Sequence, residues 1–178
     1  PHCRLSEVAL LSAHEKSTIL TDWNHQPQQY AYQDTIHQRF EKSVEASPDA
    51  IALSIADESV TYAELNARAN RLARCLREKG VVINQLVGIC LERSLDTVVS
   101  ILAVLKAGGA YVPIDPTNPE ERIRFILSDA GVSLLITQTS ILSVIPAGEF
   151  EPVILDQMEG ELNAQLDTNL ESVSGYDD

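Results

Sequence analysis

The residues of this sequence that could bind nucleotide phosphates are a lysine and two glycines, in the segment Lys106-Ala-Gly-Gly109. Phosphate loops are written G-x-x-x-x-G-K-[ST] or G-x-G-x-x-G, and neither pattern occurs in the 178 residues. Here the lysine precedes the glycines at the end of a predicted helix, where the helix dipole favours a cation and disfavours a phosphate. We therefore interpret the segment as a helix end that packs against the next strand.

The histidines and carboxylates do not form a recognisable catalytic or metal-binding pattern either. All four histidines, His2, His14, His25 and His37, lie in the first 37 residues, and none is spaced as in H-E-x-x-H. His14 falls inside a helix-capping motif and His37 falls on a predicted helix, so we expect surface or capping roles for them. Triads of serine, histidine and aspartate are recognised by geometry rather than by spacing. We assign no catalytic, cofactor-binding or metal-binding residue.

The distribution of charge argues against nucleic acid as a partner. The net charge is −13, and Arg124 is the last basic residue, so all the charged side chains at positions 125–178 are acidic. A chain of this sign repels phosphate backbones. We interpret the acidic C-terminal part as a solvated surface.

The remaining bulk features indicate a reducing, cytoplasmic setting. Cys3, Cys75 and Cys90 are odd in number and widely spaced, which fits neither a disulfide framework nor a zinc site, and we expect Cys75 and Cys90 in the core. No apolar run approaches the roughly 20 residues that span a bilayer, and the N-terminus lacks the pattern of a signal peptide. The absence of an initiator methionine fits an excised fragment or a boundary within a longer polypeptide.

The elements that would position these residues follow an alternating order. Helices are predicted at about 12–22, 35–46, 61–79, 94–107 and 118–130, and strands at 50–56, 59–61, 86–91, 110–114, 132–137 and 152–156. The pattern fades beyond Gly160. Strands that alternate with helices in units of about 25 residues indicate right-handed crossovers. The predicted fold class is therefore α/β, with a largely parallel sheet flanked by helices.

Several helix boundaries and faces are predicted in detail. Ser12 with Glu15 and Thr61 with Glu64 form capping boxes, and Ser94 and Asn118 are expected N-caps. The predicted core stripes are Ile36, Phe40 and Val44 on one helix, and Leu65, Ala69, Leu72 and Leu76 on another. We expect Arg68, Arg71, Arg74 and Arg77 to face solvent.

Two segments resemble the core signatures of adenylation domains from nonribosomal peptide synthetases. Positions 59–66 (SVTYAELN) resemble the first signature, L-T-Y-x-E-L, and positions 105–115 (LKAGGAYVPID) resemble the second, L-K-A-G-x-A-Y-V-P-[LI]-D. The signature residues are Thr61, Tyr62, Glu64, Leu65, Leu105, Lys106, Ala107, Gly108, Gly109, Ala110, Tyr111, Pro113 and Asp115. We interpret all of them as structural. The departures, Val60 for the usual Leu and Gly109 for the usual Ala, are small.

The resemblance covers about residues 36–156 and implies a domain organisation. Positions 5–25 are similar to the stretch that joins a condensation domain to an adenylation domain. We therefore expect a helical linker at residues 1–33. Residues 34–178 are expected to be a partial N-terminal subdomain of an adenylate-forming enzyme that stops before the glycine-rich ATP loop.

The resemblance also implies an activity for the complete domain. An amino acid is activated as aminoacyl-AMP with ATP and Mg2+, and the acyl group then moves to the phosphopantetheine thiol of a carrier domain. The implied partners are the remainder of the adenylation domain, the adjacent condensation and carrier domains, and a small helper protein. The groups that handle the phosphates lie in later signatures, so this fragment alone is expected to bind no cofactor and to be inactive.

Two alternatives remain open. One is a fragment of an acyl- or aryl-activating ligase of the same superfamily, and the other is an independent, non-catalytic docking module. The sequence does not specify the amino acid, the peptide product, the place of the module or the oligomeric state.

Overall fold

The computed structural model describes residues 11–24, 34–56 and 58–175, and the chain divides into two compact units, Pro1–Gln33 and Asp34–Asp178. In the first unit, helix α1 (Ala13–Ser17) continues into a π-helical turn, η2 (Thr18–Asp22). The predicted capping box starts α1: Ser12 N donates to Glu15 Oε2 at 2.8 Å and Glu15 N donates to Ser12 Oγ at 3.2 Å. Neither α1 nor η2 contains a buried residue.

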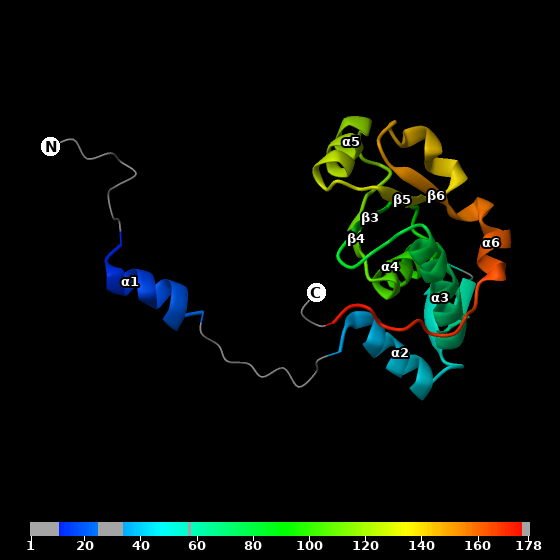
Figure 1. The fold of residues 1–178 in the computed structure, drawn as a ribbon, viewed down its shortest axis with the longest axis horizontal. Helices are drawn as coiled ribbons and strands as arrows, with labels where there is room; N and C mark the ends of the chain where they lie inside the picture. The colour runs from blue at the N-terminus through cyan, green and yellow to red at the C-terminus, as the bar shows by residue number, and fades with distance from the viewer. Residues whose placement is uncertain (1–10, 25–33, 57, 176–178) are drawn as a thin grey trace. The chain divides into compact units, whose positions relative to one another are not determined.

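The second unit contains a parallel sheet of four strands in the order β4-β3-β5-β6 (Figure 1). Its strands are β3 (Leu86–Ile89), β4 (Ala110–Pro113), β5 (Leu134–Thr137) and β6 (Glu151–Ile154). A separate antiparallel hairpin consists of β1 (Ile51–Ile55) and β2 (Glu58–Thr61). The α/β class and the largely parallel sheet are confirmed.

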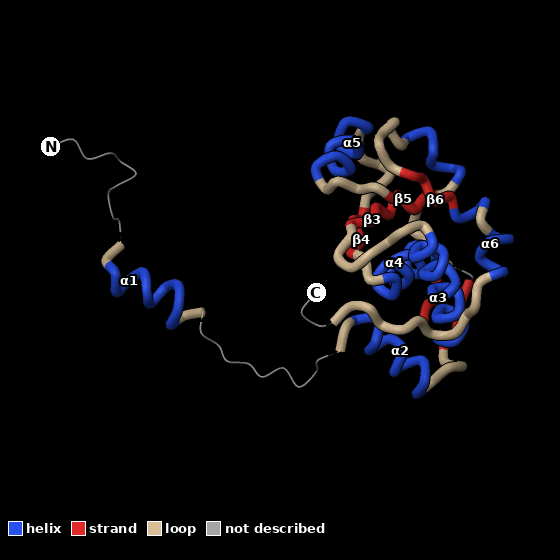
Figure 2. The backbone as a smooth tube through the Cα atoms, in the orientation of Figure 1, coloured by secondary structure: helices blue, strands red, loops and turns tan. Residues whose placement is uncertain are grey.

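Helices cover both faces of this sheet (Figure 2). The helices are α2 (Ile36–Ala46), α3 (Tyr62–Glu78), α4 (Leu95–Ala107), α5 (Glu120–Asp129) and α6 (Glu159–Ala164), with short 3-10 turns η3 (Thr139–Val144) and η4 (Leu155–Gln157). Side chains of β5 alternate between the two faces: Leu134 and Ile136 join the core under α3 and α4, whereas Leu135 joins the core under α5. All four β5 residues are buried, as expected for a central parallel strand.

The core stripe of α3 is confirmed, whereas that of α2 is confirmed only in part: Phe40 packs against the core and Val44 is half-buried, but Ile36 is exposed. Leu65, Ala69, Leu72 and Leu76 are all buried. On α2, Ile36 is 70% exposed, whereas His37 is only 5% exposed. In the first turn of α2 the residue that packs inward is therefore not the predicted Ile36 but His37, a histidine with polar partners.

Two predicted helix caps also differ from the structure. Ser94 occupies the N-cap of α4, but its side chain makes no capping hydrogen bond; the Thr97 hydroxyl instead donates to Glu92 O at 2.8 Å. Helix α5 has Pro119 at its N-cap, one residue later than predicted, because Asn118 still belongs to a turn in which its N–H donates to Asp115 O at 3.1 Å.

Residues beyond Gly160 are more ordered than the sequence pattern indicates. Helix α6 is followed by an extended segment, residues 165–175, which we call the strap. It runs alongside α3 towards α2, and is the red segment of Figure 1. Asn70 and Arg74 of α3 both donate hydrogen bonds to strap carbonyls.

Candidate functional site

The first signature segment builds the beginning of α3. Thr61 N donates to Glu64 Oε2 at 2.9 Å, and Glu64 N donates to Thr61 Oγ1 at 3.2 Å, which completes the predicted capping box. The Thr61 hydroxyl also donates to Glu64 Oε2, at 3.0 Å, and the hydrogen bonds that the carboxylate accepts, from the Thr61 backbone first and from its hydroxyl second, lower the pKa of Glu64. The Tyr62 ring lies 5.9 Å from the Phe40 ring on α2, and Leu65 is buried. The segment therefore joins α2 to α3.

The second signature segment ends α4 in a left-handed glycine turn. Gly108 has φ +98°, and its N–H donates to Leu105 O at 3.1 Å, while Gly109 N donates to Val104 O at 3.0 Å. A Cβ on Gly109 would lie 3.0 Å from Gln85 O, so an alanine at this position would require the loop before β3 to shift by a few tenths of an ångström. Ala107 is buried at this helix end. The sequence interpretation of the two glycines as a helix stop is confirmed.

The rest of the signature forms an edge of the sheet. Strand β4 starts at Ala110 and pairs with β3 alone among the described strands, and its Tyr111 is 39% exposed. Pro113 ends the strand opposite Ile89 and needs no ladder hydrogen bond there. Asp115 then accepts hydrogen bonds from the N–H (2.9 Å) and hydroxyl (2.7 Å) of Thr117, which lower its pKa.

A hollow of about 610 Å³ lies where β3 and β4 end. Ligands of open α/β sheets bind beyond the carboxyl ends of the strands, so this is the position at which a site is expected. The charged side chains that line it are Glu92, Arg93 and Asp115. This set contains no lysine, histidine or cysteine, and the part of the chain that the structure describes contains no group of three or more His, Cys, Asp or Glu residues that could hold a metal ion. The hollow therefore offers polar contacts rather than an assembled catalytic group.

Lys106, which the sequence placed at a helix end, is a buried cation. Its side chain is 1% exposed and forms an ion pair with Glu41 of α2, whose side chain is 18% exposed. Burial lowers the pKa of Lys106, and the hydrogen bond to Glu41 opposes this shift. Because Phe40 and Glu41 are adjacent, α2 contacts both signatures at once, through Tyr62 and through Lys106.

His37 was expected at the surface, and the structure corrects this. Its Nε2 lies 3.1 Å from Thr35 Oγ1 and 3.5 Å from Ser172 Oγ of the strap. Burial is the main cause that lowers the pKa of His37; Lys106 and Arg77 lower it further, whereas Glu41 raises it. The sequence signal that was missed is the position of His37, one turn before Glu41 on the same helix face.

The arginines of α3, expected in solvent, hold the strap. Arg74 donates to Leu166 O at 3.0 Å and to Thr168 O at 2.8 Å. Arg77 donates to Lys106 O at 2.7 Å and to Glu171 O at 2.8 Å. Of the predicted solvent-facing row, only Arg68 is exposed; Arg71, Arg74 and Arg77 are partly buried.

Cys75 and Cys90 are buried and free, as predicted, and burial is the main cause that raises the pKa of both thiols, that of Cys90 to about 11. They are therefore poor nucleophiles. Within residues 11–24, 34–56 and 58–175, no helix has the length and apolar character needed to cross a bilayer.

A family profile and several known proteins match this chain. The sequence profile of the AMP-binding enzyme family matches residues 40–174. The chain is 47% identical to tyrocidine synthase 3 of Brevibacillus parabrevis over 171 residues, which are 96% of this chain and 3% of that protein. It is also 47% identical to gramicidin S synthase 2 of Brevibacillus brevis over 146 residues, 82% of this chain and 3% of that protein. The chain therefore spans only a small part of the curated relatives that it matches.

Solved structures of nonribosomal peptide synthetases have a similar fold. The nonribosomal peptide synthetase FmoA3 with bound alpha-methyl-L-serine-AMP matches with a TM-score of 0.75 and 28% identity, over 82% of this chain and 16% of that chain. The N-terminal subdomain of Klebsiella oxytoca NpsA, in complex with 3-hydroxyanthranilyl-AMSN, matches with a TM-score of 0.71 and 26% identity, over 82% of this chain and 37% of that chain. The chain belongs to the AMP-binding enzyme family, and its fold is that of the N-terminal subdomain of a nonribosomal peptide synthetase adenylation domain.

Proposed function

We propose that this chain is part of a module that activates an amino acid as aminoacyl-AMP with ATP and Mg2+ and loads it onto the phosphopantetheine of a carrier domain. The observation that carries the proposal is the identity of 47% to tyrocidine synthase 3 over 96% of the chain. The structural relative with a bound aminoacyl-AMP supports the same chemistry. In this proposal residues 1–33 are the linker from a condensation domain, residues 34–178 belong to the adenylation domain, and the module is cytoplasmic.

The signatures within this chain are structural in our proposal. Thr61 and Glu64 fix the beginning of α3, and the turn at Gly108 fixes the end of α4. The phosphate-binding loop, the ribose-binding aspartate and the catalytic lysine that the family resemblance implies have no counterpart in these 178 residues. We therefore propose that the 178-residue chain by itself binds no ATP and activates no amino acid.

The direct test compares two polypeptides. The 178-residue chain titrated with ATP and Mg2+ in a calorimeter is expected to give no saturable heat, and no ATP–pyrophosphate exchange with any amino acid. A longer polypeptide that carries these residues followed by the missing signatures is expected to show amino-acid-dependent exchange. A saturable signal in the micromolar range from the 178-residue chain would place a nucleotide site within it, and the hollow beside Asp115 would be the first candidate.

A second candidate is activation of an aryl acid, which the likeness to NpsA in complex with 3-hydroxyanthranilyl-AMSN favours. The reaction is the same, and only the acid differs. Exchange assays of the longer polypeptide with the proteinogenic amino acids and with a set of hydroxylated benzoic and anthranilic acids separate the two candidates. Exchange with aryl acids alone would replace the amino-acid proposal.

A further inference from the structure

Side-chain contacts, rather than strand pairing, attach the strap to the rest of the second unit. Within the described part of the chain, the backbone of residues 166–174 makes no hydrogen bond to other backbone groups. Its apolar anchors are few: Leu170 packs partly against the core, whereas Leu166 is 67% exposed and Val173 is 44% exposed. A segment with few buried apolar contacts can open at a lower free energy than the core around it.

The first anchor is a cluster of three asparagines. Asn66 Nδ2 and Asn70 Nδ2 both donate to Asn169 Oδ1, at 2.8 Å and 3.1 Å, and Asn70 Nδ2 also donates to Asp167 O at 2.7 Å. Both α3 asparagines are buried. Their spacing of four residues places both amides on one face of the helix, which fixes the register of the strap.

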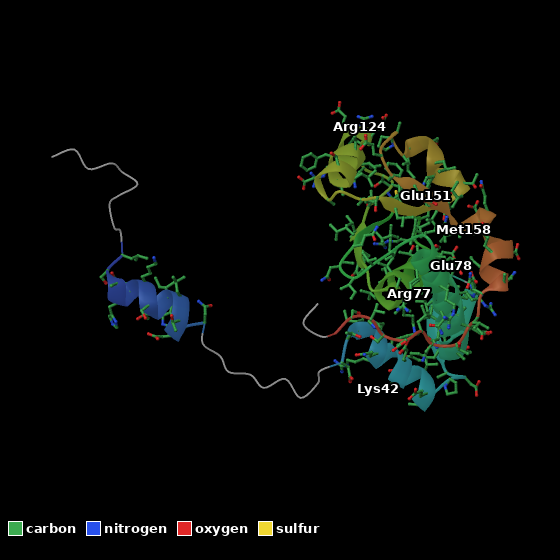
Figure 3. The ribbon with its side chains drawn as sticks, in the orientation of Figure 1. Lys42, Arg77, Glu78, Arg124, Glu151 and Met158 are labelled. Carbon is green, nitrogen blue, oxygen red and sulfur yellow. The ribbon has the colours of Figure 1, made fainter. Side chains whose placement is uncertain are left out.

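The second anchor is Arg77, which connects the strap to the glycine turn. Its guanidinium donates to Lys106 O (2.7 Å) and to Ala107 O (3.3 Å) at the end of α4, and to Glu171 O (2.8 Å) of the strap. Arg77 is labelled in Figure 3, where it lies beside the strap. A guanidinium presents its donors in a rigid planar fork, so one side chain can hold three carbonyls in place at once.

The third anchor is the contact between Val173 and the glycine turn. A Cβ on Gly108 would lie 2.7 Å from Val173 Cγ2 and 3.7 Å from Ile83 Cγ1. The strap therefore packs directly against a backbone position that has no side chain. Gly108 serves both the left-handed turn and the passage of the strap.

A further anchor is the hydroxyl of Ser172. It lies 3.5 Å from His37 Nε2, accepts from Gln38 Nε2 at 3.3 Å and donates to Ser174 O at 3.0 Å. His37 is 5% exposed. The charged groups that act on it are Glu41 from its own helix, Lys106 from α4 and Arg77 from α3, and the strap contributes the uncharged Ser172 hydroxyl.

We propose that residues 165–175 form a detachable strap that undocks as a unit while the core stays folded, and that protonation of His37 favours the undocked state. Protonated His37 is a cation buried beside two others, Lys106 and Arg77, and the carboxylate that acts on it among the described residues, Glu41, already pairs with Lys106. Release of the strap removes the cover contributed by Ser172 and admits water to the imidazolium, which relieves the cost of its burial.

Thiol labelling measures this opening directly. Leu170→Cys, in a Cys3→Ser background, places a reporter thiol on the strap, and the buried Cys75 and Cys90 report global unfolding of the same molecule. The reagent is 4,4′-dithiodipyridine, and sites are resolved by mass spectrometry. Each rate is divided by that of an unstructured peptide of residues 165–175 with the same cysteine. We expect the strap thiol to react more slowly than the peptide and well ahead of Cys75 and Cys90.

Substitutions of Arg77 test whether this anchor keeps the strap docked. Arg77→Ala is expected to raise the normalised labelling rate about tenfold or more, since charge-assisted hydrogen bonds are lost. Arg77→Lys, which keeps the charge but not the fork, is expected to raise it as well and serves if the alanine variant does not fold. Arg124→Ala, which removes an exposed ion pair with Glu120 on α5, is the matched control and should leave the rate unchanged.

The pH dependence completes the test. Between about pH 7.5 and about pH 5.5 the normalised rate should rise in the chain with His37 and stay flat in His37→Gln, which stays neutral throughout. Labelling of the strap only together with Cys75 and Cys90 would overturn the proposal, as would labelling at the rate of the free peptide. A rise at low pH that persists in His37→Gln would overturn the role of His37.

Discussion

Thr61 and Glu64 lie at the start of α3 and exchange reciprocal hydrogen bonds, so the helix end has two of its donors satisfied by two side chains. Thr61→Ala removes the side-chain acceptor and is expected to lower the free energy of unfolding by about 1 kcal/mol, measured by urea denaturation. Thr61→Ser keeps the acceptor and should cost much less. In a complete adenylation domain the amino-acid dependence of exchange should stay the same, and a loss of exchange without a change in stability would place Thr61 near the substrate instead.

The buried pair of Lys106 and Glu41 allows a double-mutant cycle. Lys106→Met leaves a partly buried carboxylate without its cation, and Glu41→Gln leaves a buried cation without its carboxylate; each is expected to cost about 3–5 kcal/mol. The double variant should be more stable than the sum of the two losses predicts, because neither charge is then left alone. The same cycle on Arg124 and Glu120, which are exposed, should give a coupling below about 1 kcal/mol. Additive losses at Lys106 and Glu41 would contradict a direct pair.

His37 gives the folded unit a pH dependence whose sign follows from its burial. Burial, with Lys106 and Arg77, holds the pKa of His37 below the ordinary value of about 6.5. Above that pH the imidazole is neutral in both the folded and the unfolded chain. As the pH falls below it, the unfolded chain takes up the proton more readily, so the free energy of unfolding falls until the pH passes the folded pKa. Equilibrium urea denaturation between pH 7.5 and pH 5 should show a steeper loss of stability than in His37→Gln, and parallel curves would contradict a buried neutral His37.

At the scale of elements, the two glycines that end α3 and α4 allow a matched comparison. Gly80 has φ +90° with no atom within 4 Å of an added Cβ, whereas Gly108 has φ +98° and would meet Val173 Cγ2 at 2.7 Å. Gly80→Ala is expected to cost about 1–2 kcal/mol, the strain of the left-handed conformation alone. Gly108→Ala should cost more, because the strap must also move. Thermal or urea denaturation of the two variants measures the difference, and equal losses would show that the strap yields at no cost.

The elements whose signals are local were predictable. The capping boxes at Ser12 and Thr61 depend on residues three positions apart, and both form as predicted. Strand β5 is buried on both faces and reads as a continuous apolar run, which is its sequence signature. Short-range hydrogen bonds and burial periodicity decide such elements, so one segment of sequence contains the information.

The features that sequence reasoning missed depend on residues far apart in the chain. Lys106 pairs with a carboxylate 65 positions earlier, and Asn70 binds a carbonyl 97 positions later. A signal for the strap was present, since Asn66, Asn70, Arg74 and Arg77 form a polar stripe with spacings of four, four and three residues along one face of α3. Of this stripe, Arg74 and Arg77 were expected to face solvent because charged side chains usually do, and no role was predicted for Asn66 or Asn70. Which backbone they bind is settled only by the tertiary fold.

At the scale of the whole chain, the candidate site divides between the two ends of the sheet. The glycine turn at Gly108 precedes β4 and lies at its amino end, with the strap and the buried pair of Lys106 and Glu41. Asp115 follows β4 and lies at its carboxyl end, beside the hollow. One eleven-residue signature therefore spans an end at which it packs against α2, α3 and the strap, and an open end beside the hollow. The packed end accounts for the structural roles that we propose for the signature, and the open end is where ligands of parallel sheets bind.

The surface of the second unit predicts the behaviour of the isolated chain. Strand β4 is an edge of the main sheet, and the two-stranded hairpin of β1 and β2 has both outer edges unpaired in the described structure. Large apolar side chains lie exposed near them, among them Ile51 (59%), Val82 (63%), Ile83 (46%) and Tyr111 (39%). An unpaired strand edge is a template for association with another chain, and a lone hairpin is only marginally stable. We expect the 178-residue chain to be marginally stable, and to self-associate or bind a hydrophobic dye.

This expectation can be tested by light scattering and dye fluorescence. The purified 178-residue chain is compared with a longer polypeptide that contains the rest of the adenylation domain. The longer polypeptide should scatter as a single species and bind little dye, because further chain is available to cover these edges and side chains. Ile51→Lys places a charge on an exposed position of the hairpin, so it should reduce association of the 178-residue chain without a loss of stability beyond about 0.5 kcal/mol. A monodisperse monomer with a sharp cooperative melt and no dye binding would contradict the prediction. It would show that residues 1–178 fold as a self-sufficient domain, and the hypothesis of an independent docking module would then gain support over that of a catalytic fragment.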